Sequence, residues 1–229
     1  MLPHRLSSAY AELLAGQRSR PWWTAVAITA SSARQAERYR EEIERRRKDG
    51  TIPAGVAYLA VPDPNDQRVG SGGATLEVLR VLGAQATAEW WLQQRVLIIH
   101  SGGDSRRLPQ YSLSGKLFSA LPLATPWGGV STVFDETLIR STGWVERMPA
   151  GFLVGSGDVI LTFDAGALRW DRPGVTGVAI RQPMDVARQH GVYVADDTGR
   201  VYSFLQKPSE AQVRAAGGLP DSGEAAVER

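Results

Sequence analysis

The sequence has no cysteine, no long apolar run and almost no net charge. Without cysteine the chain cannot form a disulfide or a thiolate metal site, and an intracellular location is permitted. No apolar run approaches the roughly 18 residues that a membrane-spanning helix needs, and residues 1–6 lack the apolar segment of a signal peptide. A formal net charge of +2 gives no reason to expect nucleic acid or a membrane as a partner. These absences predict a cytoplasmic protein that binds neither nucleic acid nor a membrane.

What is present is the composition of a globular protein. The chain has 229 residues, of which 43% are hydrophobic and 22% are charged. That length is sufficient for one large α/β domain with a sizeable core. We therefore expect a single domain over residues 1–229.

Apolar patterning predicts an alternation of strands and helices. Strands are expected at 22–30, 56–61, 95–100 and 151–155. Helices are expected at 6–16, after the capping residues Ser31 and Ser32, after a glycine-rich turn at 70–73, and at 133–141 with Gly143 just past its end. Such alternation is typical of a mainly parallel sheet with helices on both faces.

The later part of the chain has a different pattern. Prolines and glycines between 122 and 129 indicate loops. Further strands are expected at 175–180, 191–194 and 201–204, and the turn at 196–199 predicts that the last two form an antiparallel hairpin. From Ser209 onward the sequence gives only a weak helix signal.

The most informative segment is the loop that follows the apolar strand at 95–100. Open α/β sheets bind ligands at the carboxyl ends of their strands, so the loop is in a suitable place. The adjacent glycines Gly102 and Gly103 would let the backbone approach a phosphate and offer N–H groups to it. Arg106 and Arg107 supply fixed positive charge of a geometry that suits phosphate.

Lys116 adds a point charge further along this loop, and the combination favours a triphosphate site over a structural turn with exposed arginines. The loop is not a Walker P-loop, because Gly115 and Lys116 are followed by Leu117 and not by serine or threonine. It also has no dinucleotide-binding fingerprint.

The loop resembles the signature G-G-x-G-T-R-L-x-P…P-K of sugar-phosphate nucleotidyltransferases. The glycine pair, Arg107 and Lys116 match it, whereas Ser105 and Arg106 replace the usual G-T and Gly115 replaces the usual proline. These departures are similar to the pattern of the fucose-1-phosphate guanylyltransferase family. That family includes the amino-terminal half of bifunctional fucokinase/GDP-fucose pyrophosphorylases.

The resemblance implies a Rossmann-like, GT-A-like α/β nucleotidyltransferase fold. It also implies transfer of GMP from GTP to L-fucose 1-phosphate, which gives GDP-fucose and pyrophosphate. In that reaction Gly102, Gly103, Ser105 and Arg106 would bind the nucleotide. Arg107 and Lys116 would be catalytic.

Three further segments resemble the same family. The glycine-rich turn would place Gly70, Gly72 and Gly73 against the nucleotide, because a helix start offers free N–H groups. The alternative is a tight loop that needs glycine for a positive φ.

Asp158 follows a buried strand and is the expected ligand of Mg²⁺, an ion that prefers oxygen ligands and takes few from the protein. The alternative is a turn or capping aspartate, and Asp164 is a less favoured ligand. Lys207, in a segment similar to the family's E-K-P, and His190 would face the sugar phosphate. A surface lysine and a structural histidine are the alternatives. His4, His100 and His190 do not have metal-ligand spacing.

The resemblance also leaves functional alternatives open. Members of the family are usually longer, so this chain is either a truncated piece with further domains beyond it or a degenerate relative. It would then bind nucleotide without turnover, and a second metal ligand could lie beyond Arg229. Two further alternatives remain. One is a sugar kinase, and the other is a nucleotidyltransferase that uses UTP or another sugar phosphate. The tryptophans at 22, 23, 90 and 91 are expected in the core or an interface.

Overall fold

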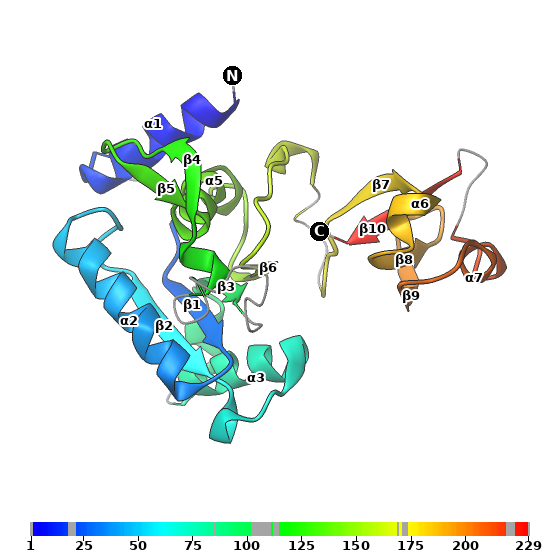
Figure 1. Cartoon of the computed structure of the whole chain (residues 1–229), viewed down its shortest axis with the longest axis horizontal. Coiled ribbons are helices and arrows are strands. Elements are labelled where there is room, and N and C mark those ends of the chain that lie inside the picture. The colour runs from blue at the N-terminus through cyan, green and yellow to red at the C-terminus, as the bar shows by residue number, and fades with distance from the viewer. Residues whose placement is uncertain are drawn as a thin grey trace. The chain divides into compact units, whose positions relative to one another are not determined.

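A computed structural model describes residues 2–17, 22–84, 86–101, 111, 115–168, 170, 174–218 and 223–228. The chain divides into two compact units, residues 1–170 and 171–229 (Figure 1). Each unit has its own sheet and its own apolar core. The prediction of one nucleotidyltransferase domain over the whole chain stays a prediction.

The first unit is built on a parallel sheet of four strands in the order β2-β1-β3-β6. The strands are β1 (Ala25–Ala30), β2 (Ala57–Pro62), β3 (Arg95–His100) and β6 (Gly151–Ser156). Every pairing in this sheet is parallel, which confirms the mainly parallel sheet. β1 is buried along its whole length, because it is central and apolar on both faces.

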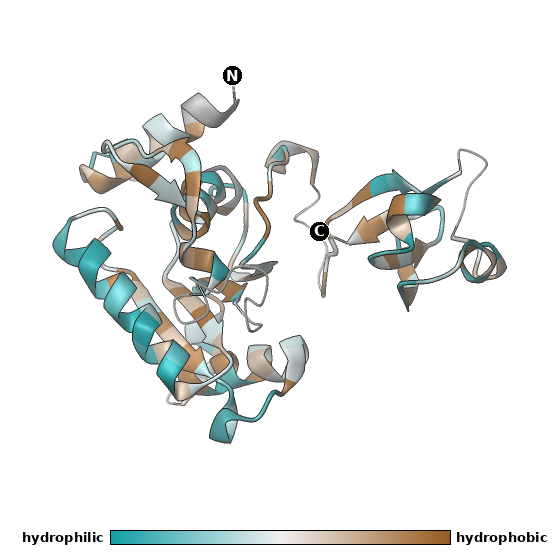
Figure 2. Ribbon diagram, in the orientation of Figure 1, coloured by the Kyte–Doolittle hydropathy of each residue, from teal (hydrophilic) through white to brown (hydrophobic). Residues whose placement is uncertain are grey.

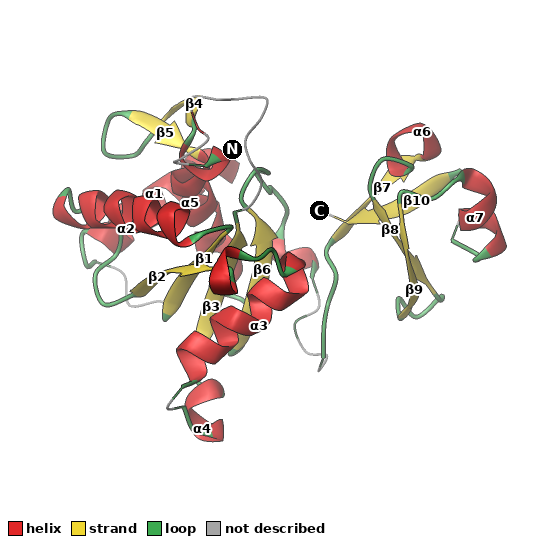
Figure 3. Ribbon diagram, turned by 60° about the horizontal axis from the view of Figure 1, so that its bottom comes forward, coloured by secondary structure: helices red, strands yellow, loops and turns green. Residues whose placement is uncertain are grey.

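Helices cover both faces of this sheet, as the alternation predicted (Figure 3). One face packs against α1 (Leu2–Leu14), α2 (Ala33–Lys48) and α5 (Val133–Val145), and the other against α3 (Gly70–Gly83). The connection from β1 to β2 therefore runs over one face, and the connection from β2 to β3 over the other. The carboxyl ends of β1 and β3 lie where the connections diverge, the position at which such sheets bind ligands.

The helix α2 begins as its sequence predicts. The hydroxyl of Ser32 accepts a hydrogen bond from the backbone N–H of Gln35 at 3.2 Å and so caps the helix. Tyr39 and Ile43 are buried on one face, and the opposite face is charged and hydrophilic (Figure 2).

The predicted end of the helix at 133–141 was wrong, because α5 continues to Val145. Gly143 lies inside the helix and is not a terminator. A Cβ atom at this position would approach the side chain of Leu6 in α1 to 3.0 Å, so glycine allows the two helices to pack closely. A capping box between Thr132 and Asp135 begins the helix.

The stretch in which prolines and glycines indicated loops also includes a short antiparallel pair, β4 (Ala120–Ala124) and β5 (Val130–Thr132). Pro122 is tolerated because two-stranded pairs consist of edge strands. The shorter elements of this unit are α4 (Ala88–Trp91) and the 3-10 helices η1 (Pro64–Asp66), η3 (Lys116–Phe118) and η4 (Ala165–Ala167).

The second unit is an antiparallel sheet in the order β7-β10-β8-β9. The predicted hairpin is confirmed as β8 (Gly191–Ala195) and β9 (Val201–Gln206). The weak helix signal after Ser209 corresponds to α7 (Glu210–Ala215). The strand expected at 175–180 is instead β7 (Ala179–Pro183), because Val175 is fully exposed and forms no ladder. The strand β10 (Glu224–Glu228) was missed, and α6 (Met184–Ala187) completes the unit.

The four paired tryptophans differ in burial. Trp23 is in the core, where its indole N–H donates to the hydroxyl of Ser141 at 2.8 Å. Trp90 is partly exposed and packs edge-on against Trp91, so a core position holds only for the first pair. Within the described part of the chain no helix is long and apolar enough to cross a membrane.

A buried ion pair joins α2 to α5. Arg46 donates to both carboxylate oxygens of Asp135, at 2.8 and 3.2 Å, and both side chains are only 5% exposed. The guanidinium also lies over the rings of Phe118 and Phe134. Removing one partner of such a pair leaves an uncompensated buried charge.

We expect Arg46→Met to lower the free energy of unfolding of this unit by about 3 kcal/mol. All seven tryptophans lie in residues 1–170, so their fluorescence during urea denaturation reports this unit alone. The control is Arg38→Met, which removes an exposed pair with Glu41 and should cost less than about 1 kcal/mol. Equal losses in the two variants would show that the buried pair does not contribute more than an exposed one.

Candidate functional site

The carboxyl ends of three strands form one polar edge of the parallel sheet. The register pairs His100 at the end of β3 with Thr29 of β1 on one side and with Ser156 of β6 on the other. The backbone N–H of Gly157 donates to the carbonyl of His100 at 2.8 Å, which extends the contact just beyond the strands. The predicted phosphate loop and Asp158 therefore follow directly from neighbouring strand ends.

Most of the predicted phosphate loop lies outside the described residues. This applies to Gly102, Gly103, Ser105, Arg106 and Arg107. The residues that flank this loop, Ser101 and the pair Gly115–Lys116, are described.

Tyr39 of α2 contacts both flanks of the loop. Its hydroxyl lies 2.7 Å from that of Ser101, and it also lies where a Cβ atom of Gly115 would project. Burial raises the pKa of Tyr39 to about 12, with the hydrogen bond to Ser101 as a smaller opposing effect. The hydroxyl is therefore protonated at neutral pH, and it links the two flanks without adding charge.

Gly115 is required at its position for two reasons. Its φ of +70° is disfavoured for residues with a side chain, and any Cβ atom would overlap the Tyr39 hydroxyl. Proline, which the common signature has here, is fixed near a φ of −65° and cannot adopt this conformation. The departure from the common signature thus has a structural cause.

Lys116 and Asp158 are brought together from positions 42 residues apart. The Nζ atom of Lys116 lies 3.0 Å from Oδ2 of Asp158, and the hydroxyl of Ser156 donates to Oδ1 at 2.7 Å. The two charged side chains are 38% and 44% exposed. Because the pair is solvated, its net contribution to stability is small and a ligand can displace it.

The pKa of Asp158 lies below its usual value. The hydrogen bond from Ser156 is the main cause, partial burial opposes it, and Lys116 lowers it further. The carboxylate is therefore ionised at neutral pH, the form that a metal ion requires. Asp164 is engaged elsewhere, since its Oδ1 accepts from the backbone N–H of Gly166 at 2.8 Å in η4. Among the described residues no cluster of three or more potential metal-ligating side chains occurs.

The glycine-rich segment begins α3, and its glycines differ in what requires them. Gly70 has a φ of +71°, which supports the structural alternative for that residue. A Cβ atom on Gly73 would approach the Cβ of Val69 to 2.7 Å. Gly72 is exposed and helical, and a Cβ atom there would contact nothing within 4 Å, so packing does not require this glycine.

From the sequence, His100 was considered only as a metal ligand, and its contacts with two other elements were not predicted. Its Nδ1 atom lies 3.2 Å from the hydroxyl of Thr29, and its Nε2 atom 2.9 Å from that of Thr75 in α3. Burial lowers the pKa of His100, and Asp63 partly opposes this shift. The one available signal was its position, at the end of the strongest strand and directly before the loop.

The two residues predicted to face the sugar phosphate are close together in the second unit. The backbone N–H of Lys207 donates to the carbonyl of His190 at 2.9 Å, because β8 and β9 pair there. The side chain of Lys207 is exposed, and its φ of +47° is unusual for a residue other than glycine.

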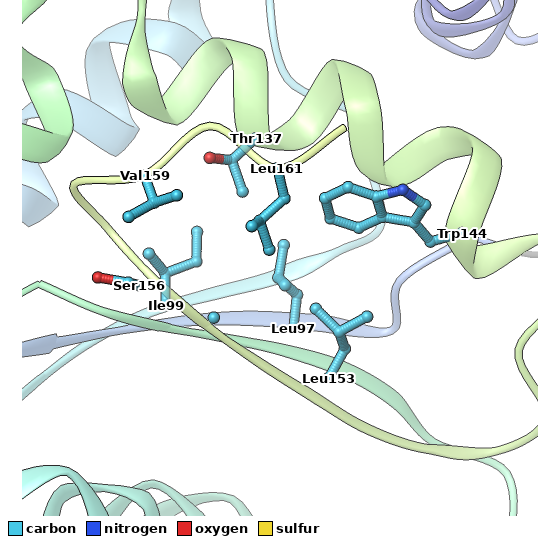
Figure 4. Close-up of a pocket in the computed structure, with 9 residues that line it drawn as sticks. Leu97, Ile99, Thr137, Trp144, Leu153, Ser156, Val159 and Leu161 are labelled. Atoms are coloured by element: carbon cyan, nitrogen blue, oxygen red, sulfur yellow. The ribbon is translucent and has the colours of Figure 1, made fainter. Parts of the chain in front are cut away.

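A small pocket lies between the parallel sheet and α5 (Figure 4). Its lining is mainly apolar and includes Leu97, Trp144 and Leu161. Because the pocket has no charged lining, it does not suit a triphosphate. The side chains of Val159 and Leu161, which follow Asp158 in the chain, form part of this apolar lining.

A comparison with protein families identifies a matching family. A family model described as the fucose pyrophosphorylase domain matches residues 88–228, a range that covers more than half of the chain. The chain belongs to the fucose pyrophosphorylase family. The matched range includes Lys116, Asp158, His190 and Lys207, and it extends across both compact units.

Curated proteins of this family are similar to most of the chain. Fucose-1-phosphate guanylyltransferase of Mus musculus is 33% identical over 201 residues, which cover 82% of this chain and 33% of the relative. The bifunctional fucokinase/GDP-fucose pyrophosphorylase of Arabidopsis thaliana is 31% identical over 222 residues, with 82% of this chain and 21% of the relative covered. The chain thus spans about a third or less of these relatives. No solved structure matched.

The contact between Tyr39 and Gly115 can be tested by a double-mutant cycle. We expect Gly115→Ala to lower the free energy of unfolding by about 2 kcal/mol, because it adds both a strained φ and an overlap. Gly50→Ala is the matched control, since Gly50 has a φ of +66° and open space around it; it should cost only about 1 kcal/mol.

In a Tyr39→Phe background, the cost of Gly115→Ala should fall by at least about 0.5 kcal/mol, because the overlapping hydroxyl is gone. Urea denaturation followed by tryptophan fluorescence measures all four corners of the cycle. Additive effects would contradict a direct contact between the hydroxyl and residue 115.

Proposed function

We propose that this chain forms the nucleotidyltransferase part of an enzyme that transfers GMP from GTP to L-fucose 1-phosphate, with release of pyrophosphate. The fold would be Rossmann-like and GT-A-like, in accord with ligand binding where β1 and β3 end. The relatives are named for this activity or for GDP-fucose pyrophosphorylase activity. The substrates would be GTP and a sugar 1-phosphate, and the location cytoplasmic.

The observation that carries the proposal is the solvated pair of Lys116 and Asp158 at the sheet edge. A nucleotidyltransferase needs a cation to balance charge that develops on the α-phosphate and a carboxylate to hold Mg²⁺. The two side chains lie 3.0 Å apart and are both partly exposed. In the absence of ligands they neutralise each other, and with substrate bound each would take its own partner.

Asp158 suits a magnesium ion that takes most of its ligands from water and phosphate. Mg²⁺ in phosphoryl-transfer sites commonly uses one or two carboxylates. The ion, when bound, would neutralise phosphate charge. Ser156 would hold Oδ1 of Asp158 in a fixed orientation, which leaves Oδ2, the atom now paired with Lys116, to face the ion.

The nucleotide would lie against the start of α3 and the loop after β3. Gly72 supports this position, because glycine in a helix is unfavourable relative to alanine by roughly 0.5–1 kcal/mol, and no packing contact requires it here. Close approach of a ligand to the backbone is the remaining reason for a glycine. Gly70, Gly73, Gly102, Gly103, Ser105 and Arg106 complete the proposed nucleotide contacts.

The phosphate oxygen of the sugar phosphate would attack the α-phosphorus of GTP, and the bond to the β-phosphate would break to release pyrophosphate. Positioning and charge neutralisation are the main contributions of the protein to such a step. Arg107 and Lys116 would stabilise the charge that develops on the phosphate oxygens.

Lys207 and His190 are proposed to bind the sugar phosphate. The left-handed backbone of Lys207 supports a functional reading, since strained residues are common where a side chain must be held for binding. The second candidate function is nucleotide binding without turnover. It is favoured by one observation, namely that the chain covers only about a third of its relatives.

Calorimetric titration of the chain with GTP, UTP and ATP in the presence of Mg²⁺ tests the proposal. We expect saturable binding that favours GTP and is lost in Arg107→Ala. Asp158→Asn should abolish the dependence of binding on Mg²⁺, and Asp164→Asn, which alters only a capping residue, should leave it unchanged.

A coupled assay for pyrophosphate with fucose 1-phosphate then separates the two candidate functions. Release of pyrophosphate supports the transferase, whereas binding without release supports a nucleotide-binding piece. Absence of nucleotide binding by a folded chain would overturn both.

Gly72→Ala gives an independent test of where the nucleotide lies. Because the added methyl group meets open space, the variant should be more stable than the parent chain by about 0.5–1 kcal/mol. The same methyl group should weaken GTP binding by about tenfold, since it would separate the phosphate from the backbone N–H groups. Urea denaturation and calorimetry measure the two effects, and unchanged GTP affinity would place the nucleotide elsewhere.

A further inference from the structure

A continuous series of hydrogen bonds links β1 to the first turn of α3 through His100. The hydroxyl of Thr75 donates to the backbone carbonyl of Ser71 at 3.0 Å, and it also lies 2.9 Å from Nε2 of His100. On its other side, Nδ1 of His100 lies 3.2 Å from the hydroxyl of Thr29. The ring therefore has a partner on each nitrogen, and each partner comes from a different element.

The tautomer of the ring depends on which acceptor the Thr75 hydroxyl uses. A threonine hydroxyl has one hydrogen, so while that of Thr75 is used in the bond to Ser71, the hydroxyl accepts from His100. Nε2 must then carry the proton, and Nδ1, without a proton in the neutral ring, accepts from the hydroxyl of Thr29. Thr29 is buried, and burial of the ring disfavours its charged form.

The series ends in the glycine-rich segment. Ser71 lies between Gly70 and Gly72, so the last hydrogen bond holds the segment that the nucleotide would approach. A second interaction at the same segment comes from the backbone N–H of Val69, which lowers the pKa of the Asp63 carboxyl just after β2 against the larger, raising effect of burial. The series through His100 thus holds the start of a helix that has no side-chain cap of its own.

We propose that His100 is a positioning residue, which holds the glycine-rich start of α3 in place for a nucleotide through hydrogen bonds that run from Thr29 to the carbonyl of Ser71. This inference rests on the proposed nucleotide site but adds to it a residue that does not contact the nucleotide. His100 acts through Thr75, and its neutral tautomer with the proton on Nε2 is the required form.

Thr75→Val removes the hydroxyl and keeps the shape of the side chain. We expect this variant to bind GTP about tenfold more weakly, because the helix start loses its connection to the sheet. Thr75→Ser, which restores the hydroxyl, should bind within about twofold of the parent chain. Thr137→Val is the matched control: Thr137 makes the same bond to the carbonyl four residues earlier in α5 but has no histidine partner.

Two measurements without nucleotide test the hydrogen bonds directly. Nitrogen-15 NMR of the ring should show His100 in the neutral form with the proton on Nε2, and with only three histidines in the chain the signal can be assigned from a His100→Gln variant. In Thr75→Val, amide hydrogen exchange in residues 70–75 should become faster, and it should not change in Thr137→Val.

The outcomes separate this inference from the proposed function. If the parent chain binds GTP and Thr75→Val binds it equally well, the inference is overturned and the function stands. A proton on Nδ1, or unchanged exchange in residues 70–75, also overturns the inference. If the parent chain binds no GTP, the proposed function fails, while the expected tautomer and exchange still support His100 as the residue that positions the helix start.

Discussion

The candidate site depends on the register of three parallel strands. In this register Thr29, His100 and Ser156 lie side by side at the carboxyl ends of β1, β3 and β6. A shift of one residue in either pairing would turn buried side chains toward the wrong face, so the two apolar cores on either side of the sheet fix the register. The polar edge is therefore a consequence of apolar packing along the strands. The same packing brings the residue just after β6 to the end of β3, as the hydrogen bond from Gly157 to the carbonyl of His100 shows.

The sequence predicted elements better than it predicted contacts. The strands of the parallel sheet and the cap at Ser32 follow from local patterns, and so does the hairpin of the second unit. Lys116 and Asp158 were each proposed as functional, but their pairing spans 42 residues, and no local pattern contains it. Gly143 was misread because glycine ends helices and also permits close helix packing, and only the position of Leu6 distinguishes the two.

Gly115 was noticed in the sequence, but the contact that requires it was not predictable. As a departure from a common sequence signature, it indicated a branch of a family but gave no reason for the change. The reason is a hydroxyl on α2 that lies between the two flanks of the loop. Tyr39 has helical spacing with Ala36 and Ile43, and this spacing indicates a shared helix face but no role for the hydroxyl. A buried tyrosine needs a partner for its hydroxyl, and that need is the one signal that could have drawn attention to it.

Two ion pairs of the first unit, one buried and one solvated, differ in what they can do for a common physical reason. Arg46 and Asp135 are buried, so opening their pair exposes uncompensated charge to an apolar interior, and the pair can act only as a fixed connection between helices. Lys116 and Asp158 are solvated, so water compensates each charge when the pair opens. A substrate with several negative charges and a divalent cation could therefore replace that pair at low cost. Solvation, more than distance, makes the second pair suitable as a site, because both pairs are about equally close.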